Sequence, residues 1–361
     1  MQIDLAKYWY RRSLHPVTLA LLPFSLLFGF SAALRRWAYQ TGIKKKYRFS
    51  VPVIMVGNIA VGGTGKTPFV IWLAQWLQAQ GHHPGIVSRG VGGKKQLKPY
   101  RVEQHDVAQE VGDEAILLRQ RTECPVVVCV DRVAAVRHLL QFSLCDIVIS
   151  DDGLQHYRLD RDLEVIMVDA TRGFGNHWLL PSGPLREPVT RLHSADLVVM
   201  NGGTETDEFS MSFKPAQLIS MHSTQNKISL SQFPHKKVHA VAGIGHPGRF
   251  FNELKQMGFE VIPHVFSDHY LYQQNDFHFK DTLPVIMTEK DAVKCRSFAD
   301  ERFWYLSMDT QINVKLEKAL LSWLNTSEIK NEYESDLSKP ACHPINPFLS
   351  DDVRQPSEPK R

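Results

Sequence analysis

The chain has 361 residues, which is long enough for two domains because a domain averages about 150 residues. Its 43% hydrophobic and 22% charged residues are typical of a globular protein and exclude a disordered chain, a collagen and a coiled coil. The five cysteines are scattered and form no CxxC pair, which argues against a disulfide framework or a structural zinc site and favours a reducing compartment.

The net charge of +4 belongs to the N-terminal part of the chain. Residues 1–48 hold nine basic side chains and one acidic side chain, a net charge of +8, so that the remainder of the chain carries −4. A protein that binds nucleic acid normally carries its basic patch on the folded domain. The distribution of charge therefore argues against nucleic acid as a partner.

An apolar segment, residues 13–34, lies between two basic clusters and contains no Lys, Arg, Asp or Glu. It has the length of about 20 residues that a membrane-spanning helix needs, but Pro16, Pro23 and Gly29 interrupt it. Basic residues on both sides favour a helix that lies in the membrane interface and reaches anionic headgroups. A cleaved signal peptide, a transmembrane helix and a buried helical hairpin are the alternatives. We therefore predict that residues 1–48 form a membrane anchor.

Residues 51–200 alternate short apolar runs with helical patterns. The first run, residues 51–56, is rich in Val and Ile, as expected of a parallel strand that is buried on both faces. A helical pattern follows over residues 68–81 and closes with a glycine. Further apolar runs occupy residues 85–88, 125–130, 146–150, 164–170 and 196–200. This alternation predicts a doubly wound, mostly parallel α/β sheet.

A second block of the same kind begins near Val238. Its strand-like and helical runs occupy residues 238–245, 249–258, 259–266, 284–287, 303–308 and 314–324. After about residue 326 the chain becomes polar and rich in Pro, a composition typical of a disordered tail. We predict a core domain over residues 49–225, a second, smaller α/β domain over residues 226–325 and a disordered tail over residues 326–361.

The segment AVGGTGKT lies between a predicted strand and a predicted helix. In a P-loop the glycines let backbone N–H groups face the phosphates, the lysine reaches the β- and γ-phosphates, and the Ser or Thr hydroxyl binds Mg²⁺. The strict pattern begins with glycine, whereas this chain has Ala60. A glycine-rich turn with a surface lysine is the alternative, but it does not explain why GKT opens a helix. The predicted nucleotide-binding residues are Ala60, Val61, Gly62, Gly63, Thr64, Gly65, Lys66 and Thr67.

Two pairs of acidic residues accompany the P-loop. Asp151 and Asp152 follow an apolar strand, at the edge of the sheet where ligands bind in doubly wound folds. Paired carboxylates at this edge are suited to Mg²⁺, directly or through water. The other pair, Asp113 and Glu114, enters a helical pattern, where helix capping is the alternative. The residues alone therefore predict a nucleotide site with Mg²⁺.

The motifs taken together resemble the tetraacyldisaccharide 4′-kinase family, the lipid A 4′-kinases, and the resemblance covers about residues 1–325. The motifs are GNIAVGGTGKTP (57–68), SRG (88–90), GDE (112–114), DDGLQHYRLDRDLEVIMVDA (151–170), LPSGPLREP (180–188), AGIGHPGRFF (242–251), SDH (267–269) and TEKDAVK (288–294). Two positions depart from the family pattern: Val91 replaces an aromatic residue, and Ala115 replaces a proline. Neither departure removes a chemical group.

The resemblance implies an activity and a location. It implies that the chain phosphorylates the 4′-hydroxyl of tetraacyldisaccharide 1-phosphate with ATP, giving lipid IVA. The implied location is the cytoplasmic face of the bacterial inner membrane, with the acylated disaccharide and the membrane surface as partners. No obligate protein partner is expected.

The family's roles are carried over to the matching residues. Asp113 matches the catalytic aspartate, which takes the proton from a sugar hydroxyl that is by itself a poor nucleophile. His269 matches the histidine that orients this base, and Lys66 reaches the phosphates. Arg186 is suited to stabilising the transferred charge or to binding a phosphate through its guanidinium. Arg89 is a weaker candidate for the same role.

The resemblance also implies a set of Mg²⁺ ligands. The implied ligands are Thr67, Glu114, Asp151 and Asp152. Gln155 and His156 are implied to support these ligands without binding the metal themselves. Lys290 and Lys294 are candidates for binding nucleotide or the acidic substrate. The implied cofactors are therefore ATP and Mg²⁺.

Two other functions remain open from the sequence. A cytosolic P-loop ATPase or a kinase for a soluble small molecule would keep the nucleotide site but would not need the apolar N-terminal segment. A nucleotide-switched protein that is tethered to the membrane and has no catalytic activity would not need a general base.

Overall fold

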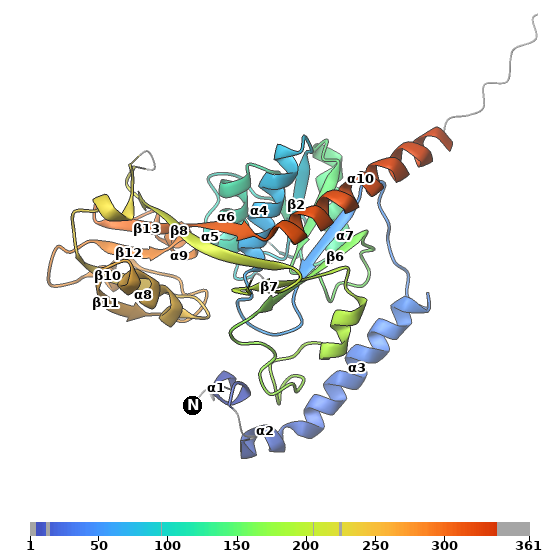
Figure 1. Cartoon of the computed structure of the whole chain (residues 1–361), viewed down its shortest axis with the longest axis horizontal. Helices are drawn as coiled ribbons and strands as arrows, with labels where there is room; N and C mark the ends of the chain where they lie inside the picture. Colours follow the sequence, from blue (N-terminus) through green and yellow to red (C-terminus); the bar gives the residue numbers. More distant parts are fainter. Residues whose placement is uncertain (1–4, 12–14, 95, 205, 224–225, 338–361) are drawn as a thin grey trace, which may run out of the picture. The chain divides into compact units, whose positions relative to one another are not determined.

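The computed structural model describes residues 5–337 apart from residues 12–14, 95, 205 and 224–225 (Figure 1). The chain divides into two compact units, residues 1–317 and 318–361, and the first unit contains the candidate site and all strands of the described residues. The predicted division near residue 225 stays a prediction.

The strands form one 13-stranded sheet. They are β1 (Val53–Gly57), β2 (Pro84–Ser88), β3 (Tyr100–Arg101), β4 (Val126–Val128), β5 (Ile147–Asp151), β6 (Leu163–Asp169), β7 (Leu197–Asn201), β8 (Ser210–Ser220), β9 (Lys227–Ile228), β10 (Lys237–Ala242), β11 (Glu260–Val265), β12 (Val285–Thr288) and β13 (Phe303–Ile312). The apolar runs of the sequence predicted all of these strands except β3, β8 and β9.

The strand order is β11-β10-β12-β13-β8-β7-β6-β1-β5-β2-β4-β3, and β9 pairs with β8. Neighbouring strands are parallel except in the pairs β13–β8, β3–β4 and β8–β9. The predicted α/β class with a mostly parallel sheet is therefore confirmed. The chain runs from β1 to β2 on one side and from β6 to β7 on the other, so the carboxyl ends of β1, β5 and β6 lie at a reversal of the strand order. Ligands bind at such a point in doubly wound sheets.

Two long strands, β8 and β13, join the two blocks of the sequence (Figure 1). They pair antiparallel from Met211 opposite Ile312 to Ser220 opposite Trp304. Strand β8 was missed because Lys214, its neighbouring proline and exposed polar side chains interrupt any apolar run. The strands predicted for a second, smaller domain thus continue the sheet of the core.

The helices are α1 (Ala6–Trp9), α2 (Pro16–Ala20), α3 (Leu22–Gln40), α4 (Lys66–Ala79), α5 (Ala108–Val111), α6 (Asp113–Thr122), α7 (Arg132–Phe142), α8 (Pro247–Gln256), α9 (Glu289–Cys295) and α10 (Val314–Leu337). Three short 3₁₀ helices cover Val189–Ser194, Leu230–Gln232 and Gln274–Phe277. Helix α10 runs past residue 326, where the sequence predicted the start of the tail, and residues 338–361 lie outside the described residues.

The core consists of apolar side chains on both faces of the sheet. All residues of β1, β5 and β6 are buried, as expected of parallel strands that are covered on both sides. Helix α7 packs through Val133, Val136 and Leu139 against Val127 and Val148 of the sheet. This packing holds the carboxyl ends of the central strands in fixed positions.

One face of helix α3 packs on the loop between β6 and the 3₁₀ helix Val189–Ser194, and the other face is exposed. The Ser25 hydroxyl donates to the backbone oxygen of Leu179 at 2.7 Å, and a Cβ at Gly29 would lie only 2.6 Å from Leu179 Cδ1. The other face carries large apolar side chains that are at least half exposed. These are Phe24, Leu26, Leu27, Phe30, Leu34 and Trp37. Among the described residues, no helix combines the length and the hydropathy that crossing a bilayer requires.

Candidate active site

The P-loop connects β1 to α4. Gly62 and Gly65 have φ values of +118° and +86°, which L side chains rarely adopt. A Cβ at Gly65 would also lie 2.5 Å from Asn201 Nδ2, so this position excludes a side chain. The Asn58 amide donates to the backbone oxygen of Ala60 at 2.6 Å and closes the loop from inside. The loop therefore has its turn in place, with Lys66 at the start of α4.

The surroundings of Ala60 explain why this P-loop does not need its first glycine. Ala60 is 7% exposed and belongs to an apolar cluster with Ile59 and Leu185. Its φ is not positive. The next residue, Val61, donates its N–H to the backbone oxygen of Pro184 at 2.8 Å. The beginning of the P-loop is thus attached to the LPSGPLREP loop.

Asp152 brings two cationic side chains to the carboxyl end of β5. Its Oδ1 lies 3.3 Å from Lys66 Nζ and 3.3 Å from Arg186 Nη1. Burial by itself would raise the pKa of Asp152, but the charges of Lys66 and Arg186 hold it below its usual range. Asp152 is therefore ionised at neutral pH and positions both cations.

Asp151, by contrast, keeps an oxygen without a partner. Its side chain is buried; Oδ2 accepts a long hydrogen bond from the Ser88 hydroxyl at 3.4 Å, and Oδ1 has no hydrogen-bond partner among the described residues. Burial, followed by the nearby charges of Glu114 and Asp152, raises the pKa of Asp151 to about 7. A divalent cation at this oxygen would favour the ionised form, so the donor chemistry fits Mg²⁺.

Asp113 and His269 meet although 156 positions separate them in the sequence. Asp113 opens α6, is 3% exposed, and both of its carboxylate oxygens lie 3.1 Å from His269 Nδ1. This hydrogen bond raises the pKa of His269. Burial alone would raise the pKa of Asp113, but the hydrogen bond with His269 and the charge of Lys290 hold it below its usual range. Asp113 is thus an ionised, oriented acceptor at neutral pH.

Two lysines of α9 surround this pair. Lys294 Nζ lies 3.7 Å from Asp113 Oδ2 and 2.7 Å from Asp291 Oδ1. Lys290 Nζ lies 3.0 Å from Glu114 Oε1, and the surrounding carboxylates raise the pKa of Lys290 although burial lowers it. The predicted Mg²⁺ ligand Glu114 is therefore already engaged by a cation. Carboxylate oxygens of Asp113 and Glu114 and a ring nitrogen of His269 all lie within 4.8 Å of one another.

The supporting role of Gln155 and His156 behind the Mg²⁺ ligands stays a prediction, and the structure gives the surroundings of both side chains. The Gln155 amide donates to the backbone oxygen of Asn58 at 3.2 Å and to Glu187 Oε1 at 2.9 Å, so it holds the base of the P-loop to the LPSGPLREP loop. Burial, followed by the charge of Arg132, lowers the pKa of His156 to about 4. His156 is therefore neutral at pH 7.

Loops from distant parts of the chain converge on the same edge of the sheet. A Cβ at Gly245 would lie 3.7 Å from the backbone nitrogen of Gly63 and 3.9 Å from Asp268 Oδ2. A Cβ at Gly92 would lie 3.9 Å from His269 Nδ1. Gly245, in the AGIGH segment, therefore lies beside the P-loop, and Gly92, two residues after the SRG segment, lies beside His269. Arg89, in the SRG segment, is exposed.

Two arginines near the site, Arg132 and Arg172, were not predicted from the sequence. Arg132 is 1% exposed and donates to the backbone oxygens of Cys129 at 2.6 Å and Asp151 at 3.0 Å, so it supports the end of β5 from below. Burial lowers the pKa of Arg132 to about 10. Arg172 lies beside the P-loop at Gly62. The only available signal was that each arginine follows the end of a predicted strand.

The chain is similar to known proteins in sequence and in structure. A family model described as tetraacyldisaccharide-1-P 4′-kinase matches residues 17–325. The chain is 46% identical over 324 residues to the tetraacyldisaccharide 4′-kinase of Nitrosococcus oceani, covering 90% of this chain and 95% of the relative. It is 49% identical over 308 residues to the enzyme of that name from Methylobacillus flagellatus, covering 85% and 92%.

A solved structure has the same fold. The crystal structure described as the apo form of LpxK from Aquifex aeolicus in complex with ATP superposes with a TM-score of 0.73. The two sequences are 29% identical, and the similarity covers 85% of this chain and 99% of that chain.

Proposed function

Because the chain belongs to the tetraacyldisaccharide 4′-kinase family, we propose that the P-loop and the Asp113–His269 pair form its phosphoryl-transfer site. The enzyme phosphorylates the 4′-hydroxyl of tetraacyldisaccharide 1-phosphate with ATP, a step of lipid A biosynthesis. The contact between Asp113 and His269, at the sheet edge where Lys66 opens α4, is the observation that carries the assignment of the site.

In this proposal Asp113 removes the proton from the attacking hydroxyl. A sugar hydroxyl is a poor nucleophile, so a base must accept its proton while the oxygen attacks the γ-phosphate. Asp113 is ionised at neutral pH because of its partners, and His269 holds both of its oxygens. The two groups share one proton, so their titration belongs to the pair.

The cations around Asp152 act on the phosphates. Lys66 lies at the position from which a P-loop lysine reaches the β- and γ-phosphates. The side chain of Arg186 is 29% exposed and its guanidinium lies beside Asp152, so it is available to a phosphate while Asp152 holds it in place. The carboxylate thus orients two positive charges toward the leaving and transferred groups.

We further propose that Asp151 and the Thr67 hydroxyl hold Mg²⁺. Asp151 has the buried oxygen without a partner, whereas Asp152 and Glu114 are each paired with at least one cationic side chain. When bound, Mg²⁺ neutralises charge on the nucleotide phosphates. Asp152 and Glu114 would then act chiefly by positioning Lys66 and Lys290.

The exposed apolar face of α3 supports attachment to a membrane surface. Side chains such as Leu27 and Phe30 are 67% and 68% exposed, and basic residues flank the segment in the sequence. An interfacial helix buries such a face among the acyl chains and places its Lys and Arg near anionic headgroups. We propose that the enzyme lies on the cytoplasmic face of the bacterial inner membrane, where it meets its lipid acceptor.

One assay tests the proposed site. The full chain is incubated with ATP, Mg²⁺ and tetraacyldisaccharide 1-phosphate in detergent micelles, and the bisphosphorylated lipid is quantified. We expect product with the wild-type enzyme and none above background with Lys66→Ala, while an exposed substitution, Arg137→Ala on α7, keeps full activity. Product formation by Lys66→Ala with an intact fold would refute the assignment of the P-loop.

A further inference from the structure

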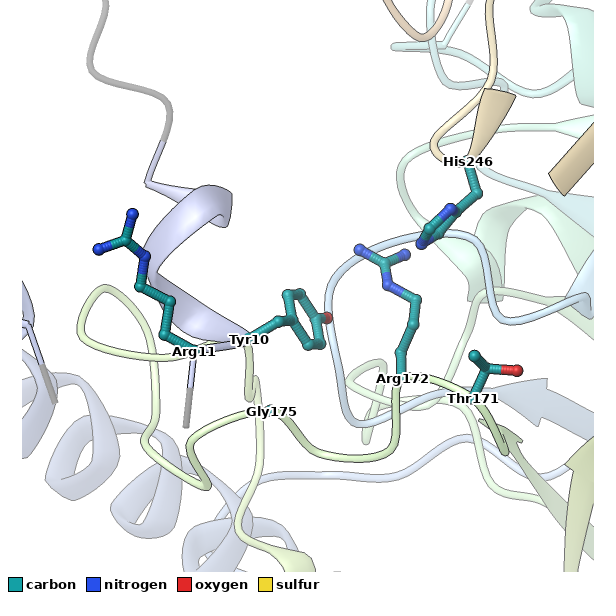
Figure 2. A pocket seen from close by; sticks show the side chains of 6 residues that line it. All are labelled: Tyr10, Arg11, Thr171, Arg172, Gly175 and His246. Atoms are coloured by element: carbon teal, nitrogen blue, oxygen red, sulfur yellow. The ribbon is translucent and has the colours of Figure 1, made fainter. Parts of the chain in front are cut away.

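A cavity of about 450 Å³ lies where the N-terminal segment meets the neighbourhood of the P-loop (Figure 2). Its lining residues are Tyr10, Arg11, Thr171, Arg172, Gly175 and His246. Figure 2 shows the ring of Tyr10 and the imidazole of His246 turned toward the guanidinium of Arg172. None of these residues belongs to the phosphoryl-transfer site proposed above.

Arg172 connects this cavity to the P-loop. A Cβ placed on Gly62 would lie 2.8 Å from Arg172 Nη1, so the guanidinium rests directly against this glycine. On its other side the guanidinium carbon lies 4.7 Å from the centre of the Tyr10 ring, within the range of a cation–π interaction. The planar cation is therefore held between an aromatic ring and the P-loop backbone.

The N-terminal segment that carries Tyr10 is attached to the loop that carries Arg172. The backbone N–H of Asn176 donates to the backbone oxygen of Trp9 at 2.8 Å. The Trp9 indole donates to the backbone oxygen of Pro181 at 3.0 Å. The segment that makes these contacts lies just before α2 and α3. Both the proposed membrane anchor and the kinase core therefore contribute residues to the cavity.

The side chain of His246 lines the cavity near Arg172. His246 is the residue before α8 and makes no side-chain cap on that helix.

The charges around the cavity are positive. The guanidinium of Arg11 lies 5.4 Å from the centre of the Tyr8 ring, and that of Arg172 lies 4.7 Å from the centre of the Tyr10 ring. The neighbouring carboxylate, Asp169, accepts the backbone N–H groups of Thr171 and Arg172 through Oδ1 at 2.9 and 3.0 Å, so it fixes the loop. A cationic, hydrogen-bonding cavity without an acidic lining residue matches a phosphate group.

We propose that this cavity is a second phosphate-binding site, with Arg172 as its principal ligand and His246 and Thr171 as further donors. Two phosphates could supply the ligand: the 1-phosphate of the lipid acceptor and the terminal phosphate of ATP. The contribution of the N-terminal segment, which also leads to the apolar face of α3, favours the phosphate of the lipid. This choice of source rests on the proposed function.

The test measures kcat and KM for Arg172→Ala, Arg172→Lys and the control Arg137→Ala with two lipid acceptors, one of which lacks the 1-phosphate. We expect Arg172→Ala to raise the KM for the 1-phosphorylated acceptor by about 10–100-fold, the effect of losing a charge-assisted hydrogen bond to a phosphate. The KM for the acceptor without that phosphate, and the KM for ATP, should change by less than about twofold. Arg172→Lys should recover part of the loss.

Other outcomes are equally informative. An increase in the KM for ATP with both acceptors would support the phosphate site and assign its ligand to the nucleotide. If neither KM changes while wild-type enzyme is active, the proposal is overturned and the proposed function stands. Loss of product with the wild-type enzyme would instead count against the function. Because Arg172 also packs on the P-loop, His246→Ala, on an exposed loop, serves as an independent variant that should raise the same KM.

Discussion

Removing either member of the Asp113–His269 pair tests the mechanism most directly. The carboxylate and the imidazole meet at 3.1 Å through both carboxylate oxygens, so each group acts on the same proton. Asp113→Ala removes the acceptor, and His269→Ala removes the group that orients it. We expect each substitution to lower kcat by about 10²–10⁴-fold, the usual range for acid–base residues.

The loss of kcat in the double variant is the more discriminating measurement. Because one proton transfer is lost in either single variant, the double variant should be no worse than the poorer single variant by more than about threefold. The KM for ATP should stay within about twofold of wild type, since neither side chain contacts Lys66 or Asp152. Asp300→Ala, which removes an exposed carboxylate paired with Arg302, is the matched control and should leave both constants unchanged.

The pH profile of kcat should shift in a defined direction when His269 is removed. The hydrogen bond with His269 helps to hold the pKa of Asp113 below its usual range, which keeps the base ionised down to low pH. Removing His269 takes this stabilisation away and leaves the burial, which raises the pKa of Asp113. The residual activity of His269→Ala should therefore fall at a higher pH than the activity of the wild-type enzyme.

The assay is steady-state phosphorylation of the lipid acceptor in micelles, with saturating ATP and a titration of Mg²⁺. Fully multiplicative losses in the double variant would show that the two residues act on separate steps. Recovery of Asp113→Ala by excess Mg²⁺ would place this carboxylate in the metal site. Either result would refute the reasoning from the shared proton.

Further predictions concern the P-loop, the metal and the membrane. Gly65→Ala should lower the free energy of unfolding by about 1–3 kcal/mol in denaturant titrations and weaken ATP binding, because alanine is strained at φ +86° and meets Asn201. Asp151→Asn should raise the Mg²⁺ concentration needed for half-maximal rate, because the variant replaces an unpartnered carboxylate oxygen with a neutral group. Leu27→Glu with Phe30→Glu should reduce sedimentation with anionic vesicles while activity in detergent is retained, because these side chains are exposed and outside the core.

Each of these expectations has a contradicting result. Wild-type stability of the Gly65 variant would mean that the loop can rearrange without cost. An unchanged Mg²⁺ requirement in Asp151→Asn, with a raised one in Asp152→Asn, would exchange the roles of the two carboxylates. Unchanged sedimentation of the α3 variant would mean that another surface attaches the protein to membranes.

Features that depend only on neighbouring residues could be predicted from the sequence. The P-loop could be identified because its glycines, Lys66 and Thr67 act through a continuous stretch of backbone between a strand and a helix. The α/β class followed from buried parallel strands, which read as continuous apolar runs. Strand β8 could not be found in this way, because its half-exposed side chains alternate around Lys214 and leave no such run.

Which charges share a site depends on contacts between distant parts of the chain. Nothing in the spacing of the chain shows that Asp152 holds Lys66 and Arg186 while Asp151 keeps a free oxygen, although the two acids are adjacent and chemically identical. The burial of each carboxylate and the cations that reach it come from strands and loops far apart in sequence. The position of Arg172 between Tyr10 and Gly62 likewise arises only when the N-terminal segment packs on the loop after β6. Local patterns specify backbone conformation, whereas the electrostatic environment of a side chain is set by whatever the fold packs around it.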